Sequence, residues 1–205
     1  MKKSGGKPRA SSRFLYIGVM SELKEKAGAL PAAAQTVWLV GLMGAGKSAV
    51  GRKLATRLGR EFIDADLEIE RSAHCSVSEI FAREGEAAFR ERERECIGTW
   101  AGRAAIVALG GGAMSQPGIP EILADAGRCV YLRARPETLA ARVGAGEGRP
   151  LLEGLDADGR LAKLSELLEK RSAAYEAAEL AVDTDGCDAE AVALAICDAL
   201  GEVTA

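Results

Sequence analysis

Residues 41–48 read Gly-Leu-Met-Gly-Ala-Gly-Lys-Ser, a complete match to the phosphate-loop pattern G-x-x-x-x-G-K-[ST]. An apolar run at 37–40 precedes the loop and fits a buried strand. The segment Lys47–Leu58 follows it, with apolar residues at every fourth position, as on one face of a helix. Strand, glycine loop and helix in this order predict a backbone cradle, closed by a helix N-terminus, for a chain of phosphates.

The side chains of this loop predict a particular kind of ligand. Lys47 is expected to reach the β- and γ-phosphates, and the hydroxyl of Ser48 is expected to ligate Mg²⁺. Further contacts to the nucleotide are expected from Gly44, Ala45, Gly46 and Ala49. The loop therefore predicts binding of a nucleoside triphosphate.

Length and charge restrict the remaining possibilities. The 205 residues fit one α/β domain with a tail. A formal net charge of −3 gives no electrostatic footprint for nucleic acid. No apolar run approaches the roughly 18 residues of a membrane span. A metabolite is therefore a more natural partner than nucleic acid or a membrane.

The cysteines and the N-terminal residues also indicate a cytoplasmic, single-domain protein. The five cysteines form no C-x-x-C pair and are expected to be reduced and to fill the core; they are Cys75, Cys96, Cys129, Cys187 and Cys197. The single histidine, His74, is expected at the surface or in a loop. Residues 1–35 begin with a basic stretch rich in Ser and Gly and are expected to be a disordered extension, which leaves 36–205 as the domain.

Apolar runs alternate with helical patterns along this domain. Strands are expected at 37–40, 61–64, 104–109, 128–132 and 180–183. Helices are expected at 47–58, 67–71, 77–83, 86–100, 119–126, 136–143, 161–178 and 189–200. This alternation predicts an α/β fold, a five-stranded parallel sheet with helices on both faces, whose ligands bind beyond the carboxyl ends of the strands.

Two carboxylates stand at the end of the second predicted strand. Residues i and i+2 of an extended chain point the same way, so Asp64 and Asp66 are both expected to project toward the phosphate loop. Phosphoryl transfer needs a metal near the γ-phosphate and an acceptor for the hydroxyl proton, and two carboxylates can divide these tasks. The alternative is that one of them only caps the following helix.

Three further features have both a functional and a structural interpretation. The glycines at 110–112 predict either a close approach of the backbone to a ligand or a plain turn. Arg90 shares a helix face with Glu93, and the default interpretation of such a charged helix is a solvated surface. Arg149 lies in the glycine-rich segment 144–159, which is either a flexible linker or a mobile lid that closes over phosphates.

Together these segments resemble bacterial shikimate kinases from about residue 36 to residue 200. The shared motifs occur in the family's order: 41–48, Asp64-Ala-Asp66, Phe89-Arg90-Glu91, Gly110-Gly-Gly-Ala113, Arg149-Pro-Leu-Leu152 and Lys170-Arg171 with Tyr175. The resemblance implies a P-loop kinase fold with a helical substrate-binding insert at about 66–100 and a lid at about 144–159. It also implies transfer of the γ-phosphate of ATP to the 3-hydroxyl of shikimate, with Mg²⁺, by a cytoplasmic monomer.

The resemblance assigns roles on the nucleotide side. It implies that Lys47 and Ser48 handle the phosphates and Mg²⁺ and that Asp64 helps to hold the metal through water. Arg142 is expected to stack on the adenine. Many relatives have a basic or Asn-containing loop after the last strand, whereas this chain has 184–188 with the sequence Thr-Asp-Gly-Cys-Asp, so adenine contacts there are expected to be mostly from the backbone.

The resemblance also assigns roles on the shikimate side. Asp66 binds the ring hydroxyls and is placed to act as the base. Arg90 and Arg171 grip the carboxylate, which suits the planar, bidentate guanidinium. Gly111 and Gly112 lie against the shikimate. Arg149 belongs to the lid, contacts both substrates and completes the catalytic set with Lys47 and Asp66.

Two other functions compete with this one. A related small-molecule kinase, such as a gluconate kinase, would share the phosphate loop, but the paired Arg90 and Arg171 and the glycines at 110–112 favour a ring acid. A nucleotide-dependent switch of the GTPase class needs an Asn-Lys-x-Asp motif to bind guanine, and this sequence contains no asparagine.

Overall fold

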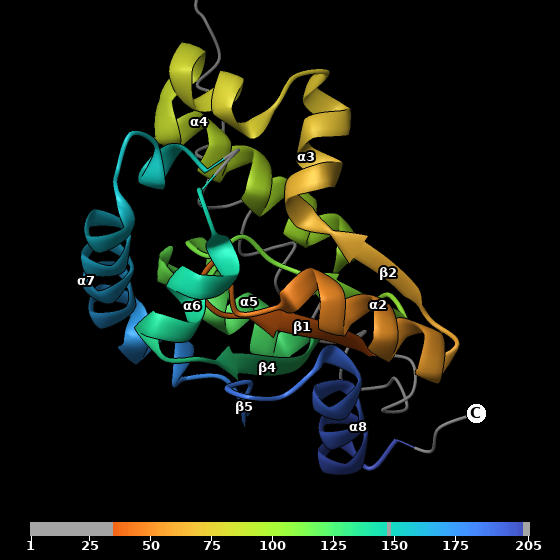
Figure 1. Cartoon of the computed structure of the whole chain (residues 1–205). Helices are drawn as coiled ribbons and strands as arrows, with labels where there is room; N and C mark the ends of the chain where they lie inside the picture. The colour runs from red at the N-terminus through yellow and green to blue at the C-terminus, as the bar shows by residue number, and fades with distance from the viewer. Residues whose placement is uncertain (1–34, 147–148, 203–205) are drawn as a thin grey trace, which may run out of the picture.

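The computed structural model describes residues 35–146 and 149–202. Within these ranges the chain forms a five-stranded parallel sheet with helices on both faces, as predicted (Figure 1). The strands are β1 Thr36–Val40, β2 Glu61–Asp64, β3 Ala105–Ala108, β4 Gly127–Arg133 and β5 Leu180–Asp183. Nearly all of the predicted extension at 1–35 lies outside the described residues.

The strand order β2-β3-β1-β4-β5 explains the position of the phosphate loop. The first strand lies at the centre of the sheet, where Trp38 pairs with Val107 of β3 on one side and with Cys129 of β4 on the other. All five residues of β1 are buried, because helices cover both faces of the sheet. The chain changes direction across the sheet at β1, so the loop that leaves this strand opens at the topological switch point.

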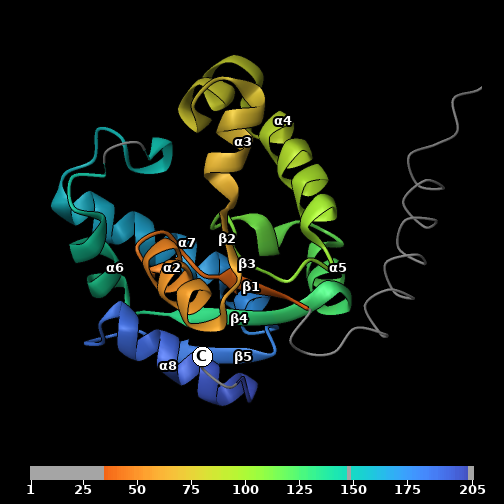
Figure 2. The same ribbon diagram turned by 90° about the vertical axis from the view of Figure 1, so that its right-hand side faces the viewer.

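Seven helices and two short 3₁₀ turns occur in the described ranges. The helices are α2 Lys47–Leu58, α3 Ala65–Ala73, α4 Val77–Trp100, α5 Ile119–Ala126, α6 Pro136–Val143, α7 Ala157–Tyr175 and α8 Ala189–Leu200; the 3₁₀ turns are η2 Ala113–Ser115 and η3 Pro150–Leu152. Figure 2 shows α3 and the first part of α4 together beyond the sheet, where the resemblance implies the substrate-binding insert. Ile97 and Trp100, at the end of α4, pack into the main core.

Most helix boundaries agree with the prediction, and the differences have local causes. Gly85 has non-helical backbone angles (φ 84°, ψ 173°) inside α4 and divides it into the two predicted segments. The helix predicted at 67–71 was too short, because α3 spans 65–73. The prediction for α7 was wrong at both ends, which lie at residues 157 and 175 and not at 161 and 178. Asp156 caps this helix by accepting a hydrogen bond from the amide of Gly159 at 2.8 Å, so the predicted loop is shorter than 144–159.

The cysteines confirm the core prediction only in part. All five are free thiols, and Cys129 and Cys197 are buried as expected. Cys187 is exposed, so the prediction that it fills the core was wrong; it lies in the loop that follows β5. His74 ends α3 in the left-handed conformation (φ 54°), in agreement with its predicted loop position. Among the described helices, none is long and apolar enough to cross a membrane.

Candidate active site

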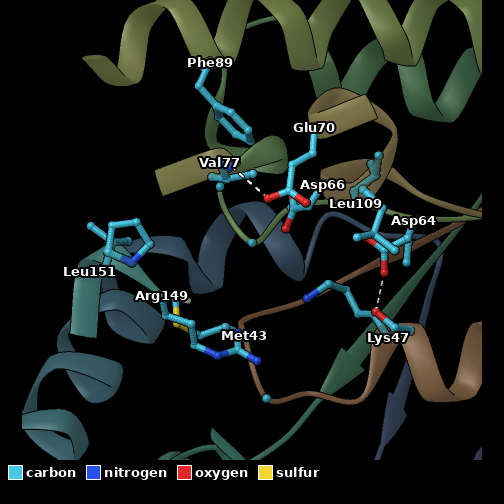
Figure 3. A pocket seen from close by; sticks show the side chains of 18 of the residues that line it. Met43, Lys47, Asp64, Asp66, Glu70, Val77, Phe89, Leu109, Arg149 and Leu151 are labelled. Atoms are coloured by element: carbon cyan, nitrogen blue, oxygen red, sulfur yellow. Dashed lines mark hydrogen bonds between the residues drawn. The ribbon is translucent and has the colours of Figure 1, made fainter. Parts of the chain in front are cut away.

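A cavity of about 580 Å³ lies at the carboxyl ends of the parallel strands (Figure 3). Its walls come from the phosphate loop, α3, α4, the glycines at 110–112, α6, the segment 149–151 and α7. The predicted site residues that line it are Gly44, Gly46, Lys47, Ser48, Ala49, Asp64, Asp66, Arg90, Gly111, Gly112, Arg142, Arg149 and Arg171. Ala45 lines a neighbouring, smaller cavity, and no predicted site residue lies away from both.

The phosphate loop has the backbone that the glycine pattern predicts. Gly46 caps α2 with φ 97°, a conformation that favours glycine, and the first turn of α2 contains no acidic residue. The free amides and the positive end of the helix dipole therefore lie beside the cavity, where an anion is stabilised.

Among residues 35–146 and 149–202, Lys47 has no carboxylate partner at hydrogen-bond distance. Its Nζ donates to the carbonyl oxygens of Gly41 at 2.8 Å and Leu42 at 3.2 Å. Desolvation in the cavity lowers the pKa of Lys47 to about 8, and attraction by Asp66 opposes this decrease only in part. Because burial disfavours the charged form, an anion placed beside Nζ would raise the pKa of Lys47 again and stabilise the protonated amine.

Ser48 and Asp64 are joined at the edge of the cavity. The Ser48 hydroxyl donates to Oδ2 of Asp64 at 2.6 Å. Asp64 occupies the N-cap position of α3, but its side chain makes no capping hydrogen bond. The alternative in which this carboxylate only caps the helix is therefore excluded for Asp64.

A hydroxyl beside a carboxylate is a donor set that suits Mg²⁺. In the described part of the chain, no group of three or more His, Cys, Asp or Glu residues could hold a metal ion. Mg²⁺ usually retains several waters and binds through one or two protein groups together with substrate phosphates. Ser48, at the end of the phosphate loop, and Asp64, at the end of β2, fit this mode of binding.

The geometric argument for Asp66 was wrong, although the residue does line the cavity. Asp66 lies in the first turn of α3 and not on extended chain, because the helix begins at Ala65. The helical turn, rather than the alternation of a strand, brings Asp66 near Asp64 and Lys47 (Figure 3). Desolvation raises the pKa of Asp66, and the charge of Lys47 opposes this rise.

The interpretation of α4 as a solvated surface at Arg90 was also wrong. Nη1 of Arg90 donates to Oε2 of Glu93 at 2.7 Å, and the side chain of Glu93 is fully buried. Gln116 donates to the same oxygen at 2.7 Å. Desolvation raises the pKa of Glu93, and Arg90 counteracts it. Sequence reasoning missed the burial of Glu93; its signal was the helical spacing from the apolar Phe89 and Ile97.

The glycines at 110–112 are needed by protein side chains that pack on them. A Cβ on Gly110 would lie 2.5 Å from Oε1 of Glu93, and a Cβ on Gly112 would lie 2.2 Å from Nη2 of Arg90. The carbonyl of Gly111 accepts hydrogen bonds from Nη1 of Arg171, at 3.0 Å, and from the hydroxyl of Tyr175. The two predicted arginines therefore converge on one loop.

Arg149 and Arg142 are the remaining predicted cations that line the large cavity, beside Lys47, Arg90 and Arg171. Arg149 stands directly before η3, beside the cavity (Figure 3), while positions 147 and 148 of the predicted lid lie outside the described residues. Leu152, at the end of η3, is fully buried and anchors this segment. Arg142 lines both the large cavity and the adjacent cavity of about 180 Å³, which borders Ala45 and the loop after β5.

The fold and the site define the class of the protein. A glycine loop at a helix N-terminus, with a lysine, a hydroxyl and two carboxylates around one cavity, is the arrangement of a P-loop phosphotransferase. Residues 43–201 match the family model described as shikimate kinase. The chain belongs to the shikimate kinase family.

Individual relatives agree with this assignment. The chain is 42% identical to a shikimate kinase of Moorella thermoacetica over 163 residues, which cover 79% of this chain and 92% of the relative. A shikimate kinase of Caulobacter vibrioides is 44% identical over 155 residues. The structure of a shikimate kinase from Acinetobacter baumannii in complex with shikimate superposes with a TM-score of 0.78 and 37% identity, covering 82% of this chain and 94% of that one. The family match decides against the gluconate kinase and GTPase alternatives.

Proposed function

We propose that this chain transfers the γ-phosphate of ATP to the 3-hydroxyl of shikimate, as a cytoplasmic monomer that uses Mg²⁺. The observation that carries this proposal is the convergence of Arg90 and Arg171 on the loop 110–112. That loop also contacts the phosphate loop, because a Cβ on Gly111 would lie 3.5 Å from the amide of Met43. A carboxylate bound by the two arginines therefore lies within a small molecule's length of a bound phosphate.

On the nucleotide side, the phosphates bind to the amides at the start of α2. Lys47 exchanges its carbonyl partners for phosphate oxygens, and the anion stabilises its protonated form. Ser48 and Asp64 hold the metal, which neutralises charge on the phosphates when it is bound. Arg149 contacts the transferring phosphate from the segment before η3.

On the acceptor side, Arg90 and Arg171 bind the carboxylate and Asp66 binds the ring hydroxyls. Glu93 accepts a hydrogen bond from Arg90 and holds it in place, and Gln116 in turn donates to Glu93. Asp66 accepts the proton of the 3-hydroxyl as the oxygen attacks, and its raised pKa makes it a stronger base than a solvated aspartate. The reaction is largely one of positioning and charge stabilisation, which the rigid sheet edge supplies.

The experiment is an assay of ADP release with shikimate, with gluconate and without an acceptor. We expect release that depends on shikimate. Asp66→Asn should decrease kcat by about 100-fold or more, since an amide cannot accept the proton, and it should leave the affinity for MgATP unchanged. Asp198→Asn, at an exposed position of α8, is the matched control. Release with gluconate alone, or normal turnover by Asp66→Asn, would contradict the proposal.

A further inference from the structure

Arg142 is held by a single residue through two hydrogen bonds. Its Nη1 donates to the hydroxyl of Thr184 at 2.9 Å, and its Nη2 donates to the carbonyl oxygen of Thr184 at 2.6 Å. Thr184 is 1% exposed, so both acceptors are shielded from solvent. Among residues 35–146 and 149–202, Arg142 takes part in no ion pair. The orientation of its guanidinium therefore depends on neutral oxygens of one residue.

This two-point contact fixes the plane of the guanidinium. Both bonds use the edge of the group, so its flat faces stay available to a ring. The position of Thr184 is itself set by the sheet, because its amide donates to the carbonyl of Arg133 at the end of β4, at 2.8 Å. A chain of contacts thus runs from the sheet edge through Thr184 to Arg142.

The cavity beside Arg142 has the composition of a site for a flat, weakly polar ring. Its small apolar residues are Ala45, Gly46, Ala49, Val50, Ala189 and Val192. Among the described residues that line it, the only acid is Asp188, whose carboxylate already accepts a hydrogen bond from the amide of Ala191 as the cap of α8. The cavity shares Gly46, Ala49 and Arg142 with the large cavity, so a nucleotide can extend from one into the other.

We infer that Thr184 is a positioning residue for the nucleoside base: its hydroxyl and carbonyl hold the guanidinium of Arg142 as a fixed platform on which the base stacks. This inference rests on the proposed function, in which Arg142 stacks on adenine. It adds a side-chain role to a loop whose nucleotide contacts the sequence predicts to be mostly from the backbone. The hydroxyl acts through Arg142 and needs no contact with the nucleotide.

The test compares a ligand that has a base with one that lacks it. Thr184→Val keeps the shape of the side chain and removes the hydroxyl acceptor. We expect its affinity for MgATP, measured by calorimetry on the full chain, to fall by about 3- to 10-fold, the effect of one hydrogen bond. Its affinity for magnesium tripolyphosphate should not change. Thr184→Ser retains the hydroxyl and should restore most of the affinity for ATP.

A double-mutant cycle separates positioning from a general effect on folding. In the Arg142→Ala background, Thr184→Val should have no further effect on ATP binding, because there is no guanidinium left to orient. If Thr184→Val does not yield folded protein, Thr184→Ala takes its place in the cycle. An equal loss of tripolyphosphate affinity, or an equal effect of Thr184→Val with and without Arg142, would overturn the inference.

The same measurements distinguish this inference from the proposals on which it rests. If Arg142→Ala weakens ATP binding but Thr184→Val does not, only the role of Thr184 fails. If Arg142→Ala leaves ATP binding unchanged, the stacking role of Arg142 fails as well, and the inference falls with it. Shikimate-dependent ADP release by the unmodified chain reports on the reaction itself, independently of both variants.

Discussion

Replacement of Gly112 by alanine should damage the acceptor site through one side chain. The backbone of Gly112 (φ −104°, ψ −2°) is accessible to alanine, so the substitution brings no conformational strain. The new Cβ would lie 2.2 Å from Nη2 of Arg90, where ordinary contact begins at 3.4 Å. The guanidinium must therefore retreat by at least about 1 Å, which is sufficient to break a hydrogen bond of ordinary length.

The size of the effect follows from the bond that is disturbed. Arg90 donates to the buried Glu93 at 2.7 Å, and a hydrogen bond between charged groups contributes about 1.5–3 kcal/mol. We expect the KM for shikimate to rise by about 10- to 100-fold, the equivalent of that energy, while the KM for ATP stays unchanged. The free energy of unfolding should decrease as well, since the buried carboxylate of Glu93 loses part of the interaction with Arg90 that offsets its desolvation.

The assay is ADP release at varied shikimate and at varied ATP, together with thermal unfolding. Gly98→Ala is the matched control: it lies on the same helix as Arg90, and a Cβ there would meet no atom within 4 Å. Alanine at this helical position should increase stability by roughly 0.5–1 kcal/mol and leave both KM values unchanged. A normal KM for shikimate in Gly112→Ala would refute the reasoning, as would an equal rise in the KM for ATP.

Three further predictions concern the cations and the loop that they contact. The affinity for MgATP should fall as the pH rises through about 8, because the protonated form of Lys47 binds phosphate and the pKa of Lys47 lies near that value. Lys47→Arg should bind MgATP without this pH dependence. Calorimetry of MgATP binding to both proteins across pH 7–9 tests this prediction. Arg90→Lys and Arg171→Lys should each raise the KM for shikimate by about 10- to 100-fold at unchanged KM for ATP, and the effects should be less than additive in the double variant. An effect on the KM for ATP alone would contradict the proposal that both arginines bind the shikimate carboxylate. Tyr175→Phe should destabilise the protein by about 1 kcal/mol and raise the KM for shikimate, because the Gly111 carbonyl keeps only its hydrogen bond from Arg171. Thermal unfolding and kinetics are measured on the same variant. A loss of stability with an unchanged KM for shikimate would show that the role of Tyr175 is purely structural.

Local sequence patterns determined the elements of the fold. The bounds of α2, β2, α5, α6, β5 and α8 agree with prediction to the residue. Each of these segments contains its own apolar periodicity, or has a proline or glycine within a few positions of its ends, so no distant contact is needed to define it. The phosphate loop is the strongest case, because one octapeptide contains both the glycines that its backbone needs and the lysine that faces the cavity.

The chemistry at the acceptor side depended on tertiary structure. The helical spacing from Phe89 and Ile97 puts Glu93 on the apolar face of α4. Its burial follows from the packing of α4 over the loop 110–112 and from Gln116. The glycines of that loop predicted either a close approach of the backbone to a ligand or a plain turn, whereas the structure shows that Glu93 and Arg90 pack closely on them.

The electrostatics of the site were also beyond the sequence. Asp66 reached the cavity by a helical turn where an extended strand was expected, and the pKa values of Asp66 and Lys47 shift because distant segments exclude water from them. The hydrogen bonds of Arg142 to Thr184 join residues 42 positions apart. Such pairings depend on which segments the sheet brings together, whereas the pattern of one segment specifies only its own helix or strand.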